Sequence, residues 1–260
     1  MNDVFNPALA AQILADAWHA GEQLTELPLD KRPTSVEQGY DIQEHLLTLL
    51  NQPLAGWKLG VGSPNLQKQS GVGRSIAGRV LGSRVYRDGD TVPLPNAAPV
   101  TIEFEIAYIL GRDITPIEDA TLAGAIADTL VTFELVLARF VDRRAVGWPS
   151  FTADNAGFHA LVVGPTIGAQ EVANLRNRLV VSLDGKEVAR SVQGDDMTDP
   201  LQALRDLIAI ARERRFTLPK GSIISTGTVS KPFTIKAPEA EVSASFLDRQ
   251  LTFRTKVSPR

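Results

Sequence analysis

Hydrophobic side chains recur at helical spacing in the first 54 residues. Asn6 precedes a proline, a pairing typical of a helix start, and apolar residues follow at intervals of three and four up to residue 24. A second helix is expected from Ser35, because Ser35 and Gln38 have the spacing of a capping box and an apolar face follows. Two prolines within residues 27–34 indicate a loop between these helices.

Beyond Pro53 the pattern changes to short hydrophobic runs separated by glycines and other turn residues. Such runs favour strands, which we expect at residues 55–60, 79–86, 100–110, 129–137, 158–163, 178–184, 187–192, 222–226, 241–247 and 250–255. Two helices interrupt them. Asp199-Pro200 begins one that has an apolar side, and residues 118–128 are interpreted as a second, shorter one.

Helices and strands do not alternate regularly after residue 54, which argues against a doubly wound parallel sheet. We therefore expect an α+β fold. A small helical part occupies residues 1–54, and a β-rich domain, in which the candidate catalytic residues lie, occupies residues 55–260.

Composition excludes several classes of protein. A chain of 260 residues with 43% hydrophobic residues can bury a sizeable core, and a net charge of -3 provides no basic field for nucleic acid or anionic lipid. The absence of cysteine excludes a disulfide framework, a thiolate nucleophile and a cysteine-ligated metal site. No stretch approaches the ~20 apolar residues that cross a bilayer, and the start resembles no signal peptide. We expect a soluble cytoplasmic protein with no nucleic-acid or membrane partner.

Two glutamates stand in an otherwise apolar strand at residues 101–110. Alternation along a strand puts Glu103 and Glu105 on one face, with bulky apolar side chains on the other. Neighbouring carboxylates repel each other and lose solvation on burial, and a hard divalent cation removes both costs. From this pair alone, the alternative is an edge strand with a solvated acidic face.

A third glutamate favours the metal site. Glu134 is the only charged residue in the run 129–137, whose other members suit a strand. A buried carboxylate without a partner is very costly, so Glu134 needs a cation or a salt bridge, for which Arg139 or Arg143 is a candidate. Three glutamates with no cysteine and few histidines suit Mg²⁺ or Mn²⁺ better than zinc.

Lys58 is the candidate acid–base residue. It stands between two bulky apolar residues in a glycine-flanked strand, where its charge is disfavoured, and this suits proton transfer or pairing with a substrate carboxylate. The alternative is a buried stem with an exposed amine. Asp154 and Asn155 precede the strand at 158–163 and either orient a ligand or cap a turn.

Other catalytic motifs are missing from the sequence. There is no complete G-x-S-x-G elbow, no P-loop and no strand–G-x-G-x-x-G–helix unit for a dinucleotide. His19, His45 and His159 fall in separate predicted elements, which does not favour a histidine-based site.

Five blocks follow one another in a specific order and spacing: GWKLGVGSPNLQKQSGVG, TIEFEIAYIL, FELVLARF, ADNAGFHALVVG and GSIISTGTV. Together they resemble the 2-keto-4-pentenoate hydratase and 4-oxalocrotonate decarboxylase family, a branch of the fumarylacetoacetate hydrolase superfamily. The resemblance implies a mixed β-roll or sandwich with a small N-terminal helical part. It implies Mg²⁺ or Mn²⁺ bound by Glu103, Glu105 and Glu134, with Lys58 facing the substrate. It also implies homo-oligomers.

The activity expected from this resemblance is that of a lyase in aromatic meta-cleavage catabolism. Metal-dependent hydration would convert a 2-hydroxy-2,4-dienoate of the 2-oxopent-4-enoate type into a 4-hydroxy-2-oxo acid. One alternative is a 4-oxalocrotonate-type decarboxylation of a 2-oxo acid, which shares its intermediate with the hydration. A further alternative is a catalytically silent subunit that supports a partner enzyme of the pathway.

The expected substrate-binding residues are Lys58, which is also catalytic, Ser63, Asp154, Asn155 and Gly157. A departure from the family lies at the end of this set.

The family commonly has serines after Asp-Asn-Ala, where Gly157 and Phe158 stand here. The missing hydroxyl favours a substrate with an uncharged far end, whereas Lys68 and Arg74 are the candidate partners of a second carboxylate. The hydrolase branch's His–Glu pair has no counterpart in the sequence, which disfavours hydrolysis of a C–C bond.

Overall fold

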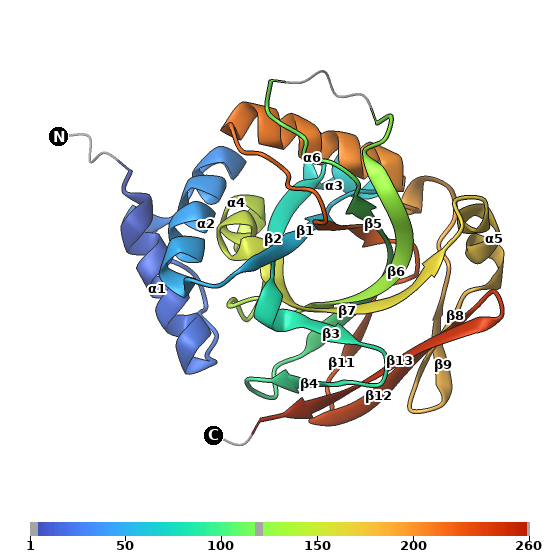
Figure 1. Cartoon of the computed structure of the whole chain (residues 1–260). Coiled ribbons are helices and arrows are strands. Elements are labelled where there is room, and N and C mark those ends of the chain that lie inside the picture. The colour runs from blue at the N-terminus through green and yellow to red at the C-terminus, as the bar shows by residue number, and fades with distance from the viewer. Residues whose placement is uncertain (1–4, 118–121, 259–260) are drawn as a thin grey trace.

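The computed structural model describes residues 5–117 and 122–258 of the chain (Figure 1). It begins with helices α1 (Pro7–Ala20) and α2 (Val36–Leu50). Both start as the sequence predicts, because the side chain of Asn6 accepts a hydrogen bond in the first turn of α1 and Ser35 does so in α2. Helix α1 ends earlier than predicted. Gly21 turns the chain there with a φ of 65°, a left-handed conformation that glycine adopts without strain.

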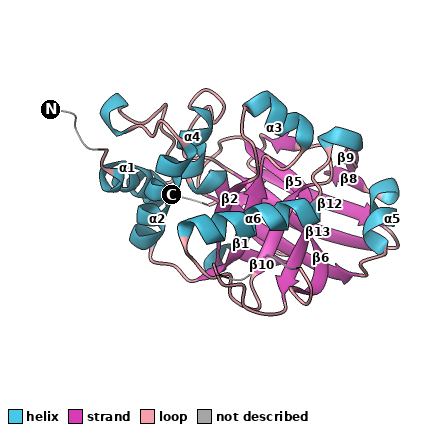
Figure 2. Cartoon of the chain, turned by 90° about the horizontal axis from the view of Figure 1, so that it is seen from above, coloured by secondary structure: helices cyan, strands magenta, loops and turns pink. Residues whose placement is uncertain are grey.

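Helix α2 packs against α1 on one side and against α4 (Gly147–Ala153) on another, beside the sheets (Figure 2). Their contact buries a cluster of apolar side chains that includes Leu14, Leu46 and Phe158. Since Phe158 comes from a strand of the β-rich part, the N-terminal helices share a core with that part.

The strands form two sheets. The first has the order β2 (Ile76–Leu81), β1 (Leu54–Gly60), β10 (Ile223–Thr228), β5 (Val100–Leu110), β6 (Ile126–Val136), β7 (Phe158–Ile167) and β3 (Val85–Arg87), with β11 (Phe233–Ile235) also paired to β5. The second has the order β4 (Thr91–Leu94), β13 (Arg249–Val257), β12 (Glu239–Phe246), β8 (Val180–Leu183) and β9 (Lys186–Arg190). The first sheet curls around its own concave face (Figure 1).

Aromatic side chains join the two sheets. Phe104 of β5 and Phe133 of β6 meet with ring centroids 5.1 Å apart, and they also contact Phe246 and Phe253 of the second sheet at 5.4 and 5.2 Å. Because side chains alternate along a strand, the neighbours of these phenylalanines in β5 and β6 point to the opposite, concave face. The convex face of the sheet therefore carries the core, and its concave face is left for polar residues.

Three further helices complete the fold: α3 (Pro64–Ser70), α5 (Glu171–Arg178) and α6 (Pro200–Arg214). Helix α6 starts at the predicted Asp199 cap, whose carboxylate accepts from the amides of Leu201 and Gln202. Single 3-10 turns occur at Leu29–Lys31, Gly82–Arg84, Asn155–Gly157 and Gly194–Asp196. No helix of the described residues is long and apolar enough to span a membrane.

The predicted α+β class is confirmed, but several predicted elements differ. The strand expected at 79–86 is two strands, β2 and β3, because a 3-10 turn at Gly82–Arg84 interrupts it. Of the helix expected at 118–128, residues 118–121 lie outside the described residues, and residues 126–128 belong to β6, where Asp128 pairs with Ile109. The short elements α3, α4, α5, β4 and β11 were not predicted, since a few residues carry little periodic signal.

Candidate active site

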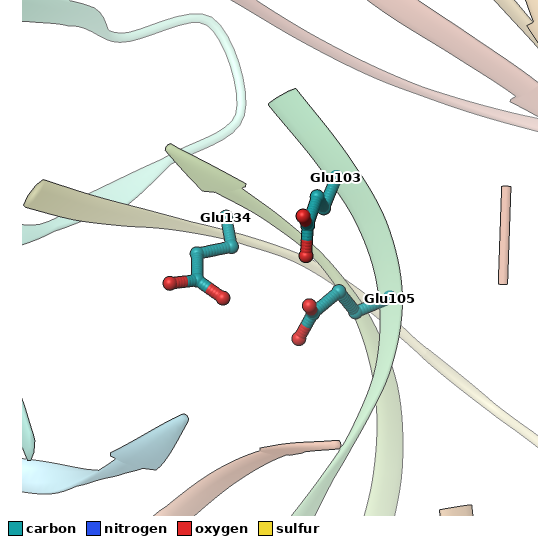
Figure 3. Close-up of side chains that lie close together, drawn as sticks. All are labelled: Glu103, Glu105 and Glu134. Carbon is teal, nitrogen blue, oxygen red and sulfur yellow. The ribbon is translucent and has the colours of Figure 1, made fainter. Parts of the chain in front are cut away.

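Three glutamates meet on the concave face of the first sheet. Glu103 and Glu134 are directly opposite each other in the antiparallel pair β5–β6, and Glu105 lies two residues further along the same face of β5. One carboxylate oxygen from each lies within 4.8 Å of the others, and the close-up in Figure 3 shows the three side chains pointing toward one another. The alternation predicted from the sequence is confirmed, and the edge-strand alternative fails because β5 is an interior strand.

Two of these carboxylates are fully buried and incompletely hydrogen-bonded. Glu105 and Glu134 are both 0% exposed, whereas Glu103 is half-buried. Oε2 of Glu105 accepts from Ser225 Oγ at 2.6 Å and from the Gly227 amide at 3.1 Å. Within the described residues, Oε1 of Glu105 and Oε2 of Glu134 have no hydrogen-bond partner. Unsatisfied buried oxygens of this kind normally have a bound ion or water as their partner.

The electrostatics of the cluster also favour a bound cation. Burial raises the pKa of Glu105 well above its usual range, and the nearby Glu134 and Glu103 raise it further. Burial likewise raises the pKa of Glu134 to about 7, although Lys58 opposes the shift. One divalent cation at the centre of the cluster would offset both the repulsion and the lost solvation, and oxygens within 4.8 Å of one another can surround an ion bound at ~2.0–2.6 Å. The cluster therefore fits a hard divalent cation.

Raised carboxyl pKa values predict how the metal-free protein responds to pH. The folded state favours the protonated form, so this stabilisation is complete below the ordinary glutamate pKa and is lost as pH rises through about 7. In chelator, the wild type should lose on the order of 1–3 kcal/mol of stability between pH 5 and pH 8 relative to Glu134→Gln. Thermal melting of both proteins over this range, with and without Mg²⁺, is the measurement.

Added Mg²⁺ should remove that loss at pH 8, because the ion binds deprotonated carboxylates. Wild type and Glu134→Gln melting in parallel across this pH range would contradict the account of the cluster.

Lys58 approaches the glutamates from strand β1. Pairing of β1 with β10, β10 with β5 and β5 with β6 brings Lys58, Ser225, Glu105 and Glu134 onto one face. The lysine is 1% exposed. Its Nζ lies 3.0 Å from Glu134 Oε1, an ion pair without the alignment of a hydrogen bond, and donates to the Ala156 carbonyl at 2.9 Å. The alternative of an exposed amine is therefore excluded.

A cavity of about 430 Å³ opens beside these groups, a volume suited to a small organic acid. Lys58 and Glu103 lie in its wall. The rest of the wall combines backbone and polar groups with apolar side chains. It comes from the ends of β1, β6 and β10, the segments that follow these strands, helices α3 and α4, and the residue before the α6 cap: Leu59, Gly60, Val61, Gly62, Ser63, Leu66, Gln69, Ser70, Val136, Arg143, Arg144, Gly147, Trp148, Phe151, Thr198, Gly227, Thr228 and Pro232.

Of the predicted substrate-binding residues, Lys58 and Ser63 are in this wall, and the Ser63 hydroxyl also caps α3. Asp154, Asn155 and Gly157 are buried and are not among its lining residues. Asn155 exchanges hydrogen bonds with the backbone of Arg79 in β2, at 2.6 and 2.9 Å. These residues hold the turn whose Ala156 carbonyl receives the Lys58 ammonium, and contact with substrate stays a prediction for them.

Asp154 is the partner of Arg139, which rules out Arg139 as the partner of Glu134. The Arg139 backbone amide donates to Asp154 Oδ2 at 2.7 Å, and its guanidinium donates to Asp154 and to the Phe158 carbonyl. Both side chains are buried, at 6% and 0% exposure.

Arg139→Met should destabilise the fold by about 3–5 kcal/mol, because it leaves Asp154 charged, buried and unpaired. The matched change Arg178→Met, in the exposed pair with Asp248, should cost less than about 1 kcal/mol. Denaturant unfolding of the two variants measures the difference. Equal losses of unfolding free energy in the two variants would show that the buried Arg139–Asp154 pair stabilises the fold no more than an exposed pair does.

Sequence reasoning missed several groups of the site. Ser225, Gly227 and the Ala156 carbonyl contact the charged residues, and Arg144 lies in the cavity wall. Arg143 lies there too, but it was considered only as a salt-bridge partner of Glu134, and among the described residues Glu134 pairs with Lys58 instead. Ser225 and Gly227 belong to the GSIISTGTV block. The resemblance marked this block as part of the family pattern, but nothing in the sequence indicated the role of either residue. Of the two basic residues expected at the far end, Arg74 pairs with Glu213, and neither it nor Lys68 lines the cavity.

Comparisons with known proteins show what this chain is similar to. The family model described as "Fumarylacetoacetate (FAA) hydrolase C-terminal" matches residues 80–254. The chain is 30% identical over 187 residues to a 2-keto-4-pentenoate hydratase of Paraburkholderia phymatum, covering 71% of each chain. It is 27% identical over 234 residues to a 4-oxalocrotonate decarboxylase of a Pseudomonas species, covering 87% of this chain and 89% of the relative.

Among solved structures, the 4-oxalocrotonate decarboxylase from Pseudomonas putida G7, complexed with magnesium and adipate, matches with a TM-score of 0.82. The match has 20% identity and covers 98% of this chain and 100% of that chain. A 2-hydroxyhepta-2,4-diene-1,7-dioate isomerase from Mycobacterium marinum matches with a TM-score of 0.54 at 19% identity, over 80% and 78% of the two chains. At these identities the matches establish a shared fold.

Proposed function

Since the chain belongs to the fumarylacetoacetate hydrolase family, as the match over residues 80–254 shows, we propose that it is a metal-dependent lyase acting on 2-hydroxy-2,4-dienoates. The proposed reaction is addition of water to give a 4-hydroxy-2-oxo acid, a step of aromatic meta-cleavage catabolism. The observation that carries the proposal is the convergence of three glutamates and a buried lysine beside one cavity of about 430 Å³.

Glu103, Glu105 and Glu134 would hold the cation, and their all-oxygen donor set suits Mg²⁺ or Mn²⁺. When bound, such an ion supplies Lewis-acid stabilisation of negative charge on the C2 oxygen of the substrate. Ser225 and the Gly227 amide fix the Glu105 carboxylate by donating to its Oε2. They leave its Oε1 free to face the cluster.

Lys58 is proposed to move the protons. Tautomerisation takes a proton from the 2-hydroxyl oxygen and returns one to C5, after which hydroxide adds at C4 and a proton at C3. Among the described residues that line the cavity, the titratable side chains are Lys58, Glu103, Arg143 and Arg144. Arginine does not release its proton in proteins and Glu103 belongs to the metal cluster, so Lys58 is the group suited to this task.

The hydrocarbon part of a dienoate fits the apolar section of the wall. Leu59, Val61, Val136, Trp148 and Phe151 provide that section. A wall of this kind keeps bulk water away from the reacting chain and strengthens the electrostatic contacts at the C1–C2 end.

Decarboxylation is the second candidate. The relatives of this chain include decarboxylases as well as hydratases, so the comparisons support both reactions. A 4-oxalocrotonate decarboxylase is a relative over 87% of this chain, and another shares its fold with a TM-score of 0.82. A silent partner subunit is the weakest candidate, because a chain that had lost catalysis would not need to keep three glutamates and a buried lysine around one cavity.

The test is to offer 2-hydroxypenta-2,4-dienoate and 2-oxohex-3-enedioate separately to the protein with Mg²⁺. We expect the dienoate to give a 4-hydroxy-2-oxo acid, identified by mass spectrometry, and little CO₂ to come from the enedioate. Rapid CO₂ release without hydration of the dienoate would replace the hydratase by the decarboxylase. Inactivity on both compounds would contradict hydration of the five-carbon dienoate as well as decarboxylation of the enedioate.

A further inference from the structure

Two arginines in the cavity wall form no ion pair with a carboxylate of the described residues. Arg143 and Arg144 lie between β6 and α4, and no ion pair joins either guanidinium to a residue in the described ranges 5–117 and 122–258. The neighbouring carboxylate of Asp142 binds backbone amides and not a guanidinium, because its Oδ1 accepts hydrogen bonds from the amides of Arg144 and Ala145. The loop is thereby fixed while its positive charge stays available to a ligand.

Arg143 is the better placed of the two. It is half-buried, whereas Arg144 is exposed. Lys58 Nζ lies 5.7 Å and Arg143 Cζ lies 5.9 Å from the centre of the Phe151 ring. The distance between the two cations therefore cannot exceed the sum of these two distances. A six- or seven-carbon dioate in extended form spans roughly 6–8 Å between its carboxyl carbons, from ordinary bond lengths. A ligand of that length can therefore reach from one cation to the other.

The cavity also has room at this end. A second cavity of about 320 Å³ shares Val136, Arg143, Arg144 and Pro232 with the first, so the arginines lie where the two meet. The wall of the first cavity thus carries the charged side chains of Lys58, Glu103, Arg143 and Arg144 together with apolar residues such as Phe151 and Trp148.

We propose that Arg143 binds a second carboxylate at the far end of the substrate, so that the enzyme prefers a 2-hydroxy-2,4-dienedioate to a dienoate with an uncharged tail. This inference rests on the proposed lyase function and adds its substrate class. The carboxylate accepts hydrogen bonds from the planar guanidinium, a geometry that arginine offers and lysine does not.

Gly157 and Phe158 do not determine the charge of the tail that this cavity accepts. The expectation of an uncharged tail came from these two residues in place of serines, but neither residue is among those that line the cavity. Gly157 has a φ of 68°, and a Cβ there would lie 2.9 Å from side-chain atoms of Phe151 and Val136. Glycine at this position is explained by packing.

An arginine at the far end also bears on which reaction occurs. Loss of CO₂ moves the negative charge of a carboxylate into the dienolate, so a cation paired with that carboxylate stabilises the starting state and slows the step. Hydration leaves the far carboxylate unchanged. Arg143 therefore fits a dioate hydratase, in which the second carboxylate is recognised and retained.

The experiment uses compounds that differ only at C7. Turnover with Mg²⁺ is measured on 2-hydroxyhepta-2,4-diene-1,7-dioate and on 2-hydroxyhepta-2,4-dienoate, and binding is measured by calorimetry with the unreactive 2-oxoheptanedioate and 2-oxoheptanoate. The proteins are wild type, Arg143→Gln, Arg143→Lys and Arg205→Gln. Arg205 is an exposed residue of α6 and serves as the control for net charge.

The wild type should prefer the dioate of each pair by about 10- to 100-fold. Within each protein, the preference is the ratio of kcat/KM and of affinity for the dioate over the monocarboxylate. Arg143→Gln should lose most of that preference, Arg143→Lys should keep part of it, and Arg205→Gln should keep all of it. Equal binding of the two 2-oxo acids by the wild type, or an unchanged preference in Arg143→Gln, would overturn the assignment. Discrimination in binding without turnover of either dienoate would instead contradict the proposed lyase and leave the Arg143 site standing.

Discussion

Replacement of Glu105 by glutamine is expected to abolish Mg²⁺-dependent turnover while the protein stays folded. Glutamine has the same shape, but its amide is a poorer ligand for a hard cation than a carboxylate. Changing even an outer partner of a metal ligand typically lowers metal affinity about 10- to 100-fold, so loss of a ligand should cost roughly 100-fold or more. Calorimetric titration with Mg²⁺ and Mn²⁺ measures the affinity, and a dienoate assay measures the turnover.

The metal-free variant should also melt at or above the temperature of the metal-free wild type at pH 8. Glu105 is buried, and both Glu134 and Glu103 raise its pKa, so removing its charge relieves repulsion. Glu187→Gln, in an exposed pair with Arg190, is the matched control and should behave like the wild type. A Glu105→Gln variant that binds Mg²⁺ normally and turns over fully would show that the glutamate cluster is not the metal site.

Loss of Lys58 is expected to lower kcat by roughly 10²–10⁴, the range typical of an acid–base group. Lys58→Met is the most informative change, because methionine fills much of the buried volume that alanine would leave empty. Lys58→Arg should not restore the rate, since arginine does not give up its proton. Steady-state kinetics at saturating Mg²⁺ separates kcat from KM.

Metal binding provides the control for this prediction. Lys58 Nζ lies 3.0 Å from Glu134 Oε1, so removing the ammonium should leave Mg²⁺ affinity unchanged or raise it. A Lys58→Met variant with normal turnover would reduce Lys58 to a structural partner of Glu134. A variant that loses Mg²⁺ binding along with turnover would make the lysine a support of the metal site.

The sequence predicted the parts of the site that lie within one strand. Alternation along β5 placed Glu103 and Glu105 together, and Glu134 was marked by its apolar neighbours in β6. Both inferences hold because a strand fixes the direction of alternate side chains locally. The caps at Asn6 and Ser35 were predictable for the same reason, since a cap needs a few adjacent residues.

Contacts between distant strands were beyond such reasoning. Lys58 meets Glu134 only because β1 pairs with β10 in parallel and β10 with β5, an order that no local pattern specifies. The resemblance to a family placed Lys58 and Glu134 in one site, but it did not supply the contact between them. It also did not supply the position of Asn155, which hydrogen-bonds to the backbone of β2. Nor did it supply the position of Arg143 in the cavity wall, because that position depends on how α4 packs in the folded chain.

Turnover of a 2-hydroxy-2,4-dienoate by this protein should require a bound divalent cation. The most direct test follows the ultraviolet absorbance of 2-hydroxypenta-2,4-dienoate and of 2-hydroxyhepta-2,4-diene-1,7-dioate after the protein has been stripped with EDTA, and again after Mg²⁺ is added in excess. We expect no loss of absorbance in chelator and rapid loss of at least one dienoate once Mg²⁺ is present, with no such recovery in Glu105→Gln. Loss of absorbance at the same rate in chelator, or stability of both dienoates in Mg²⁺, would contradict this expectation.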